Sequence, residues 1–278
     1  MAIEFAGKVA VVTGAGRRGG LGEAIVRRLA GAGCSVVLSD IGAQADASTP
    51  TAMIGAKSEM QALALEIAAQ TEARMESFAC DVRDASRVAA LAQFAVSTLG
   101  SLDIWVNNAG IGYIMKPLLE VSSDDWRAVI DVNLTGCFNG IQSAARHMIR
   151  QGGGRIINIA SQAAKSGFPF AAAYCASKHA LVGLVRSVAI ELGPHGITVN
   201  NVCPNHVTTG LGAWQNEYFS KKRGLTVERY LEQMNARIPL GRCGVPQDTA
   251  NAVAFLCSAE ASYITAESLN VSGGEEPH

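Results

Sequence analysis

Residues 8–22 read KVAVVTGAGRRGGLG, a β-rich run followed by a glycine-rich turn. An amphipathic helix is expected directly after this turn, over residues 23–32. Glycines between a strand and a helix let backbone N–H groups reach a pyrophosphate, whose charge also suits the positive helix N-terminus. The stretch therefore predicts the first unit of an α/β fold that binds a dinucleotide. The candidate contacts in it are Gly14, Arg17, Gly20 and Leu21.

The next expected strand, residues 35–40, ends in Asp40, 20 residues after Gly20. A carboxylate at this place can accept hydrogen bonds from both hydroxyls of the adenosine ribose, and it would repel a 2′-phosphate. The sequence therefore predicts NAD in preference to NADP, with Ile41 beside the same cofactor. Two alternatives stay open, because Asp40 could cap a helix and either Arg17 or Arg18 could pair with a phosphate.

Strand-like and helix-like segments keep alternating after Asp40, an order typical of an α/β fold with a parallel sheet. Further strands are expected at 74–80, 102–106, 155–160, 197–202 and 268–271, and helices at 57–72, 85–99, 122–150, 171–192 and 246–258. With no linker, repeat or second core, residues 1–278 are expected to form one domain.

Two segments interrupt this alternation. Residues 41–58 are rich in small and polar residues, and we expect a mobile surface loop there. Residues 205–240 interleave aromatic and polar side chains, which predicts one or two short helices that form a lid over the site. A surface subdomain is the alternative for this second segment. The basic run 221–223 within it is expected to be a solvated face.

Composition excludes several classes of function. The 23 basic and 24 acidic side chains nearly cancel, which argues against a nucleic-acid or anionic-membrane partner. No run approaches the roughly 18 apolar residues that a membrane helix needs, and the sequence shows no signal peptide. The seven cysteines are scattered through apolar segments without a CxxC pair, which is typical of reduced, buried thiols in a cytoplasmic protein and predicts no metal site.

Tyr174 and Lys178 are the strongest candidates for chemistry. The sequence around them reads as helix, so a spacing of four residues puts both side chains on one face, one turn apart. A neighbouring ammonium favours the phenolate and lowers the tyrosine pKa, so we expect Tyr174 to act as a general acid and base. Ser161 follows a strand, at the edge where open α/β sheets place their ligands. Asn133 lies in a predicted helix beside Gly136, so a local break in that helix is expected.

These pieces together resemble the short-chain dehydrogenase/reductase family over essentially the whole chain. The matching residues are Thr13-Gly14 to Gly20-Leu21-Gly22, Asp40, Asp81-Val82, Asn107-Asn108-Ala109-Gly110, Asn133, Ser161, Tyr174 with Lys178, Pro204 to Thr209 and Asn270 to Gly274. The resemblance implies a Rossmann-type, doubly wound sheet of seven parallel strands and a catalytic tetrad. In that tetrad Ser161 would hydrogen-bond the substrate oxygen, Tyr174 would exchange its proton and Lys178 would hold the nicotinamide ribose. Asn133 would fix a water that relays protons to Lys178.

The resemblance also implies further cofactor contacts. They are Asp81 and Val82 at the adenine, Asn108, Ala109 and Gly110 along the adenosine ribose, and Pro204, Val207 and Thr209 near the nicotinamide carboxamide. Two departures matter: the first glycine loop is about two residues longer than the family pattern, and Asn205 stands where the family has glycine. Because asparagine tolerates left-handed backbone, the turn at Asn205 is expected to survive.

Similar members act on polyols and vicinal hydroxyketones, which favours an NAD-dependent dehydrogenase of a small polyol, sugar alcohol, hydroxyketone or cyclic alcohol. Candidate substrate contacts are Gln162, Ala163, Phe168, His206 and Trp214, with a solvent-exposed turn as the alternative for His206. Two other functions stay open: a 3-oxoacyl-thioester reductase that uses NADPH, and a non-catalytic NAD(H)-binding sensor. Similar proteins are usually homotetramers, so we expect assembly through the helices at 122–150 and 171–192.

Overall fold

The computed structural model describes residues 3–42 and 54–276. Seven parallel strands form one sheet in the order β3-β2-β1-β4-β5-β6-β7. The strands are β1 (Val9–Thr13), β2 (Ser35–Asp40), β3 (Met75–Ala79), β4 (Ile104–Asn107), β5 (Gly154–Ile159), β6 (Ile197–Pro204) and β7 (Ser268–Val271). The predicted doubly wound α/β fold is confirmed, since the order reverses between β1 and β4, as in other sheets of this kind.

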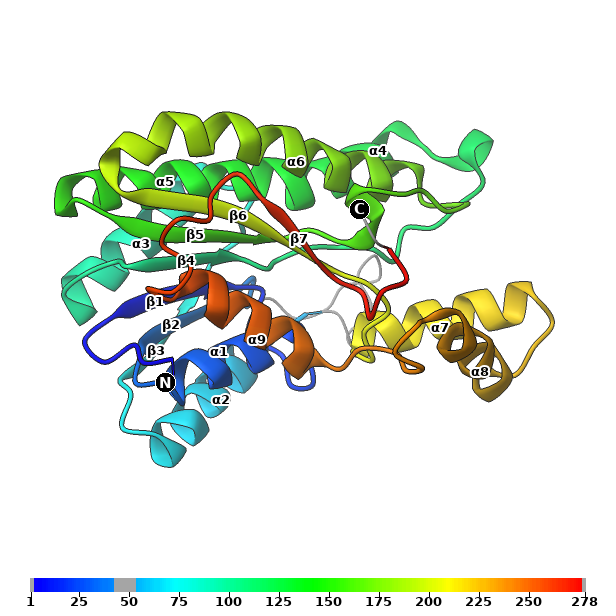
Figure 1. The fold of residues 1–278 in the computed structure, drawn as a ribbon, viewed down its shortest axis with the longest axis horizontal. Helices are drawn as coiled ribbons and strands as arrows, with labels where there is room; N and C mark the ends of the chain where they lie inside the picture. The colour runs from blue at the N-terminus through cyan, green and yellow to red at the C-terminus, as the bar shows by residue number, and fades with distance from the viewer. Residues whose placement is uncertain (1–2, 43–53, 277–278) are drawn as a thin grey trace.

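Helices cover both faces of the sheet (Figure 1). On one face lie α1 (Leu21–Ala30), α2 (Lys57–Gln70) and α9 (Pro246–Cys257), and on the other α3 (Ala85–Leu99), α4 (Ser123–Ile130), α5 (Gly136–Gln151) and α6 (Ala172–Leu192). Two apolar clusters fill the spaces between these layers, and Trp105 of β4 is fully buried in one of them. All five residues of β1, VAVVT, are buried. Because both faces of the strand are covered, its sequence is a nearly continuous apolar run and does not alternate with polar residues.

A row of buried amides crosses the middle of the sheet. Asn107 donates to Asn158 Oδ1 at 2.8 Å, Asn158 donates to Asn201 Oδ1 at 3.1 Å, and Asn201 donates to Ser268 Oγ at 2.9 Å. Each amide would be costly to bury alone, so the row fixes the relative positions of β4 to β7. Asn107, which the sequence placed in a polar turn beside the cofactor, therefore lies in the core.

The helix predicted over residues 122–150 is broken where expected. Ser122 caps α4 by accepting from Asp125 N–H at 3.0 Å, and a π-helical turn, Asp131–Thr135, then leads into α5. A π-turn inserts one extra residue into the helix and rotates the residues after it. It carries Asn133, which is fully buried, toward the carboxyl ends of the strands.

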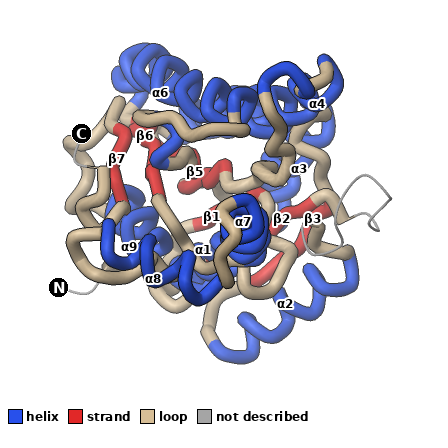
Figure 2. The backbone as a smooth tube through the Cα atoms, turned by 90° about the vertical axis from the view of Figure 1, so that its right-hand side faces the viewer, coloured by secondary structure: helices blue, strands red, loops and turns tan. Residues whose placement is uncertain are grey.

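Two helices extend beyond those strand ends. The segment predicted as a lid forms α7 (Gly210–Lys222) and α8 (Val227–Arg237), and Figure 2 looks onto the strand ends with α7 lying in front of them. The surface loop predicted at 41–58 lies mostly outside the described residues, and Lys57 and Ser58 already belong to α2. Among the described helices none is long and apolar enough to cross a membrane.

Candidate active site

The glycine-rich turn packs against the loop that follows β4. Gly14 has a φ of 63°, and a Cβ there would lie 2.6 Å from Ala109 Cα. The amide of Asn108 donates to the carbonyl oxygens of Thr13 and Gly14, at 2.9 and 2.8 Å. Only glycine fits position 14, because the backbone there is left-handed and the neighbouring loop leaves no room for a Cβ.

Because the glycine loop is longer than the family pattern, its sequence does not show which of the later glycines approach a ligand. A Cβ on Gly16 would lie 2.6 Å from Cβ of Asp40, so this glycine lets the loop cross over the end of β2. Gly19 has a φ of 70° with open space around it, and its N–H donates to Glu23 at 2.6 Å. Gly20 precedes α1 and lines a groove that runs along the neighbouring strand ends.

The groove has a volume of about 630 Å³ and lies on the glycine-loop side of the sheet edge. It is lined by Gly14, Arg17, Gly20, Leu21, Asp40, Ile41, Asp81, Val82, Asn108, Ala109, Gly110 and Thr209, among others. A second cavity of about 440 Å³ adjoins it and shares Leu21, Asn108, Gly110 and Thr209 with it. The remaining cofactor candidates, Tyr174, Lys178, Pro204 and Val207, line the second cavity. The structure thus brings every predicted cofactor contact to one continuous surface.

Asp40 closes β2 with its carboxylate at this groove. Its oxygens accept from Gly16 N–H at 3.0 Å and from Ile41 N–H at 2.8 Å. Burial raises the pKa of Asp40, while these backbone donors and Arg17 oppose the rise. The side chain does not cap a helix, because the two residues that follow it, Ile41 and Gly42, are not helical.

Asp81 and Val82 follow β3 at the outer end of the groove. Burial works against the charged form of Asp81, but hydrogen bonds from the guanidinium and the backbone N–H of Arg83 hold its pKa below the usual range. Asn139 of α5 donates to the carbonyl of Val82 at 2.9 Å and fixes this turn. Asp81 thus presents to the groove a carboxylate that is ion-paired with Arg83, and Val82 presents a largely buried apolar side chain.

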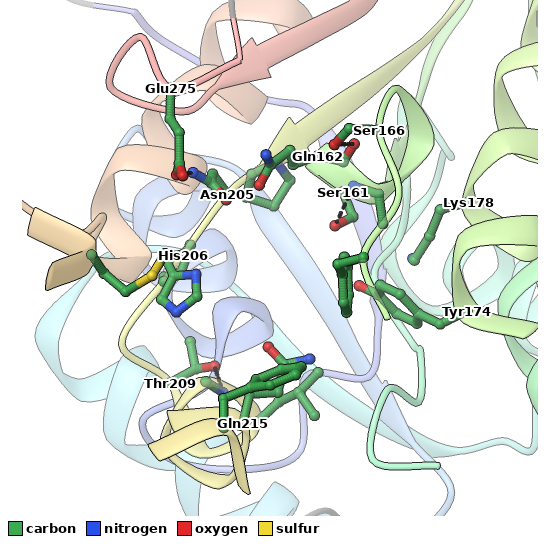
Figure 3. Close-up of a pocket in the computed structure, with 18 of the residues that line it drawn as sticks. Ser161, Gln162, Ser166, Tyr174, Lys178, Asn205, His206, Thr209, Gln215 and Glu275 are labelled. Atoms are coloured by element: carbon green, nitrogen blue, oxygen red, sulfur yellow. Dashed lines mark hydrogen bonds between the residues drawn. The ribbon is translucent and has the colours of Figure 1, made fainter. Parts of the chain in front are cut away.

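Tyr174, Ser161 and Lys178 line the second cavity, which adjoins the groove. Figure 3 shows the Tyr174 phenol and Ser161 facing the same space from different elements. Lys178 is buried behind them and donates from Nζ to the carbonyl of Ile159 at 2.7 Å. Its ammonium lies 5.7 Å from the centroid of the Tyr174 ring. The helical spacing therefore brings the two side chains together, as the sequence predicts.

The predicted direction of the Tyr174 pKa shift is wrong for this structure. Burial raises the pKa of Tyr174, and only a hydrogen bond with Ser161 opposes the rise. Burial also lowers the pKa of Lys178. The ammonium points to the Ile159 carbonyl rather than to the phenol oxygen, so desolvation outweighs its attraction for a phenolate. Tyr174 is accordingly a phenol that holds its proton at neutral pH.

Asn133 lines neither cavity but fixes the loop beside them. Its Oδ1 accepts from Ile111 N–H at 2.8 Å, and its Nδ2 donates to the Ile111 carbonyl at 2.9 Å and to Ser177 Oγ at 3.2 Å. A Cβ on Gly110 would lie 3.3 Å from Asn133 Oδ1 and 3.8 Å from Lys178 Nζ. Asn133 thus ties the strand-end loop to α6 within a few ångströms of Lys178.

Four of the five predicted substrate contacts line the second cavity: Gln162, Ala163, Phe168 and His206. Trp214 does not, and it stacks on Tyr218 at 5.4 Å between ring centroids. The reason is helical phase, because Leu211, Gln215 and Phe219 repeat every four residues on the α7 face that lines the cavity. Trp214 is one position before Gln215 and is therefore turned by about 100° from that face.

The wall opposite Tyr174 is polar (Figure 3). His206 lies on this wall rather than in a solvent-exposed turn, and its Nε2 is 3.4 Å from the Tyr230 hydroxyl. Burial lowers the pKa of His206, and the negative charge of Glu275 opposes this shift. Asn205 donates to Glu275, and Arg237 pairs with the same carboxylate at 2.8 Å. Asn205 is not left-handed, since the only described non-glycine residues with positive φ are Phe170 and Ala266.

Sequence reasoning missed Glu275 and did not connect the basic run with the cavity. Glu275 comes from the segment after β7, and its side chain is only 7% exposed. No periodicity or motif marks it, because its position depends on contacts with Asn205 and Arg237 from distant segments. Lys221, Lys222 and Arg223 are exposed, as predicted for a solvated face, and Lys222 and Arg223 also line the cavity.

Comparisons with known proteins agree with this geometry. A family model described as enoyl-(acyl carrier protein) reductase matches residues 14–276. A 3-oxoacyl-acyl-carrier-protein reductase of Staphylococcus aureus is 38% identical, over 96% of this chain and 97% of its own. An L-2,3-butanediol dehydrogenase of Corynebacterium glutamicum is 35% identical, over 96% and 98%. The carveol dehydrogenase of Mycobacterium avium, solved with NAD, is 30% identical over the whole of both chains, with a TM-score of 0.90.

Proposed function

The chain belongs to the short-chain dehydrogenase/reductase family, and from this premise we propose that it is an NAD-dependent dehydrogenase of secondary alcohols. The observation that carries the proposal is the meeting of the Tyr174 phenol and the Ser161 hydroxyl in a cavity that adjoins a nucleotide-sized groove. An alcohol in the cavity would have its carbinol carbon beside the groove and its oxygen beside both hydroxyls.

The groove suits a dinucleotide. Gly14 lets the turn lie against the loop after β4, and Gly20 ends the turn at the N-terminus of α1, where a pyrophosphate is favoured. Asp40 and Ile41 would hold the adenosine ribose, and Lys178 the nicotinamide ribose. When bound, the nicotinamide supplies the acceptor or donor of a hydride.

Side chains of the protein would transfer the proton and bind the substrate oxygen. In ketone reduction, Tyr174 gives its proton to the carbonyl oxygen while Ser161 donates a hydrogen bond to the same oxygen. In alcohol oxidation the transfers run in reverse, and Tyr174 must first lose its own proton. The raised pKa of Tyr174 favours the acid form, so reduction starts from the major protonation state near neutral pH.

Asp40 supports NAD over NADP. Its carboxylate is fixed by backbone donors from Gly16 and Ile41, so it cannot turn away from a 2′-phosphate without losing them. Burial raises the pKa of Asp40, and the backbone donors and Arg17 oppose this rise and favour the charged form. The second candidate function is an NADPH-dependent 3-oxoacyl-thioester reductase, which the 38% identity to the Staphylococcus aureus reductase favours.

A substrate panel tests the proposal and separates the two candidates. Small polyols, sugar alcohols, vicinal hydroxyketones and cyclic alcohols are oxidised with NAD and with NADP, and acetoacetyl thioesters are reduced with NADH and NADPH. We expect secondary alcohols to be oxidised with NAD as the better cofactor. Faster turnover of thioesters with NADPH would support the second candidate. Tight NADH binding without any turnover would instead indicate a sensor.

We also propose that the protein is a homotetramer. We further propose that it is cytoplasmic, because its cysteines are free thiols. Large apolar side chains are exposed on α4 to α6, with Trp126 at 43%, Phe138 at 45%, Ile149 at 40% and Ile190 at 78%. Phe138 and Ile149 are about three turns apart and share one face of α5. All seven cysteines are free, as reducing conditions would keep them.

Replacing Ile190 with Glu should break this assembly, because it puts a charge into an apolar interface. Size-exclusion chromatography with light scattering should show about four times the 29.0 kDa chain mass for the native protein and a smaller species for I190E. Leu65→Glu is the matched control, since Leu65 is 73% exposed on α2, on the opposite side of the sheet. A native protein of one chain mass would contradict the assembly.

A further inference from the structure

An apolar band separates the reacting end of the substrate cavity from its rim. Phe168 lies 6.4 Å from Tyr174 and 6.1 Å from Phe219, and Phe219 stacks on Tyr230 at 6.5 Å, all between ring centroids. Met234 of α8 also lines the cavity. A substrate that reaches from Tyr174 to the rim therefore passes over ring faces, and its middle part is favoured when it is apolar.

Two cations lie at the rim, each over an aromatic ring. Lys222 Nζ is 5.1 Å from the centroid of the Phe170 ring and 5.8 Å from that of Tyr218. Arg223 Cζ is 5.3 Å from the centroid of the Tyr230 ring. Cation–π contacts of this kind hold a side chain without neutralising its charge.

The backbone at Phe170 fixes the position of that ring. Its φ is 72°, a left-handed conformation that is uncommon for a residue with a side chain. Its carbonyl accepts from Lys116 N–H at 3.0 Å, which ties the turn to the loop before α4. The ring that holds Lys222 thus belongs to a constrained segment of the rim.

The charges along the cavity do not balance. Glu275, the one acidic side chain among the described residues that line it, is paired with Arg237 and hydrogen-bonded by Asn205. Within residues 3–42 and 54–276, no ion pair joins Lys222 or Arg223 to a carboxylate. The rim therefore carries two positive charges that the paired Glu275 does not offset.

We propose that Lys222 and Arg223 bind an anionic group at the far end of the substrate. The substrate class is then a keto or hydroxy acid with an apolar body, and the anion is a carboxylate or the phosphate of a phosphopantetheine thioester. The inference rests on the proposed function, because it assigns the substrate of the same cavity. The proposal also narrows the substrate class, because a neutral sugar alcohol has neither an apolar body for the aromatic rings nor an anion for Lys222 and Arg223.

Matched ketones test the proposal. The probes are 3-(4-oxocyclohexyl)propanoate and its primary amide, which differ in charge at one end only. We expect NADH-dependent reduction of the acid to have a kcat/KM roughly tenfold higher than that of the amide, mainly through KM, as two partly exposed ion pairs allow. Added salt should reduce this ratio, because it screens exposed charges.

A double variant, Lys222→Met with Arg223→Met, should bring the ratio of acid to amide close to one. Lys221→Met is the control, because it removes one positive charge next to Lys222 at a residue that does not line the cavity. It should leave the ratio as it is. A ratio that survives in the double variant would show that other groups select the acid and would overturn the proposal.

A second arm identifies the source of the anion. Reduction of acetoacetyl-CoA is compared with that of its N-acetylcysteamine thioester, which lacks the phosphates. A preference for the CoA thioester that disappears in the double variant assigns the site to a phosphate. If neither the acid nor the CoA thioester is preferred over its neutral counterpart, the proposal is overturned.

Calorimetric titration of the same probes into the enzyme with NADH keeps this result separate from the proposed function. Selective binding of an anionic probe without turnover would support the rim site while contradicting the dehydrogenase assignment. Turnover of both ketones with equal kcat/KM would leave the dehydrogenase assignment intact and contradict the rim site.

Discussion

Tyr174→Phe should lower kcat for alcohol oxidation and ketone reduction by roughly a thousandfold, within the range that general acid–base catalysis contributes. The substitution removes one oxygen and keeps the ring, so its contact with Phe168 remains. Ser161 can still hydrogen-bond the substrate oxygen, but no group at that place exchanges the proton. Turnover is followed by NADH absorbance at saturating cofactor and substrate.

NADH binding separates lost chemistry from lost structure. Fluorescence titration of Tyr174→Phe should give a dissociation constant close to that of the native protein, because the groove along Gly14 and Asp40 is untouched. Tyr263→Phe is the matched control, since Tyr263 is fully exposed in the segment after α9. Near-native turnover in Tyr174→Phe would remove Tyr174 from the chemistry.

Asp40→Ser should change the cofactor preference by roughly a hundredfold, measured as the ratio of kcat/KM with NADH to that with NADPH. Hydrogen bonds to a charged group contribute about 1.5–3 kcal/mol, so most of the ratio comes from weaker use of NADH. Loss of the negative charge also removes the repulsion of a 2′-phosphate, and NADPH should improve. Ser keeps one acceptor for Gly16 N–H, which limits damage to the glycine loop.

Asp81→Asn provides the comparison for this change. Asp81 lines the outer end of the same groove, where both cofactors carry the same adenine, so its loss should affect NADH and NADPH alike. An unchanged ratio in Asp40→Ser, or an equal change in Asp81→Asn, would contradict the role of Asp40 in selecting NAD.

The part of the fold that holds the cofactor was predictable from sequence because it depends on local patterns. The run KVAVVT, the glycines after it and Asp40 at the end of the next strand are neighbours in sequence or separated by one helix. The break near Asn133 was predictable too, since Asn and Gly are poor residues for a helix interior. Tyr174 and Lys178 needed only helical spacing.

The substrate cavity was much less predictable, since its walls come from segments far apart in the chain. Glu275 reaches the wall only through partners on α8 and just after β6, and no pattern near it indicates this. Lys222 and Arg223 are exposed as predicted, but sequence cannot show that they also line the cavity. Trp214 was misplaced because sequence cannot show which face of α7 meets the cavity.

The direction of the Tyr174 pKa shift depends on geometry that spacing alone does not fix. Four residues of helix bring the Lys178 ammonium within 5.7 Å of the ring centroid, but the Ile159 carbonyl holds it. Desolvation of the phenol then decides the sign. A shared helix face therefore predicted the contact between the two side chains but not its electrostatic result.

The pH dependence of alcohol oxidation tests the role of Tyr174 most directly. Below its raised pKa, the phenolate fraction of Tyr174 grows about tenfold per pH unit, so kcat/KM with saturating NAD should rise with that slope from about pH 6 to about pH 9. The slope should vanish in the residual activity of Tyr174→Phe. A flat profile in the native protein, or the same slope in the variant, would show that another group takes the proton.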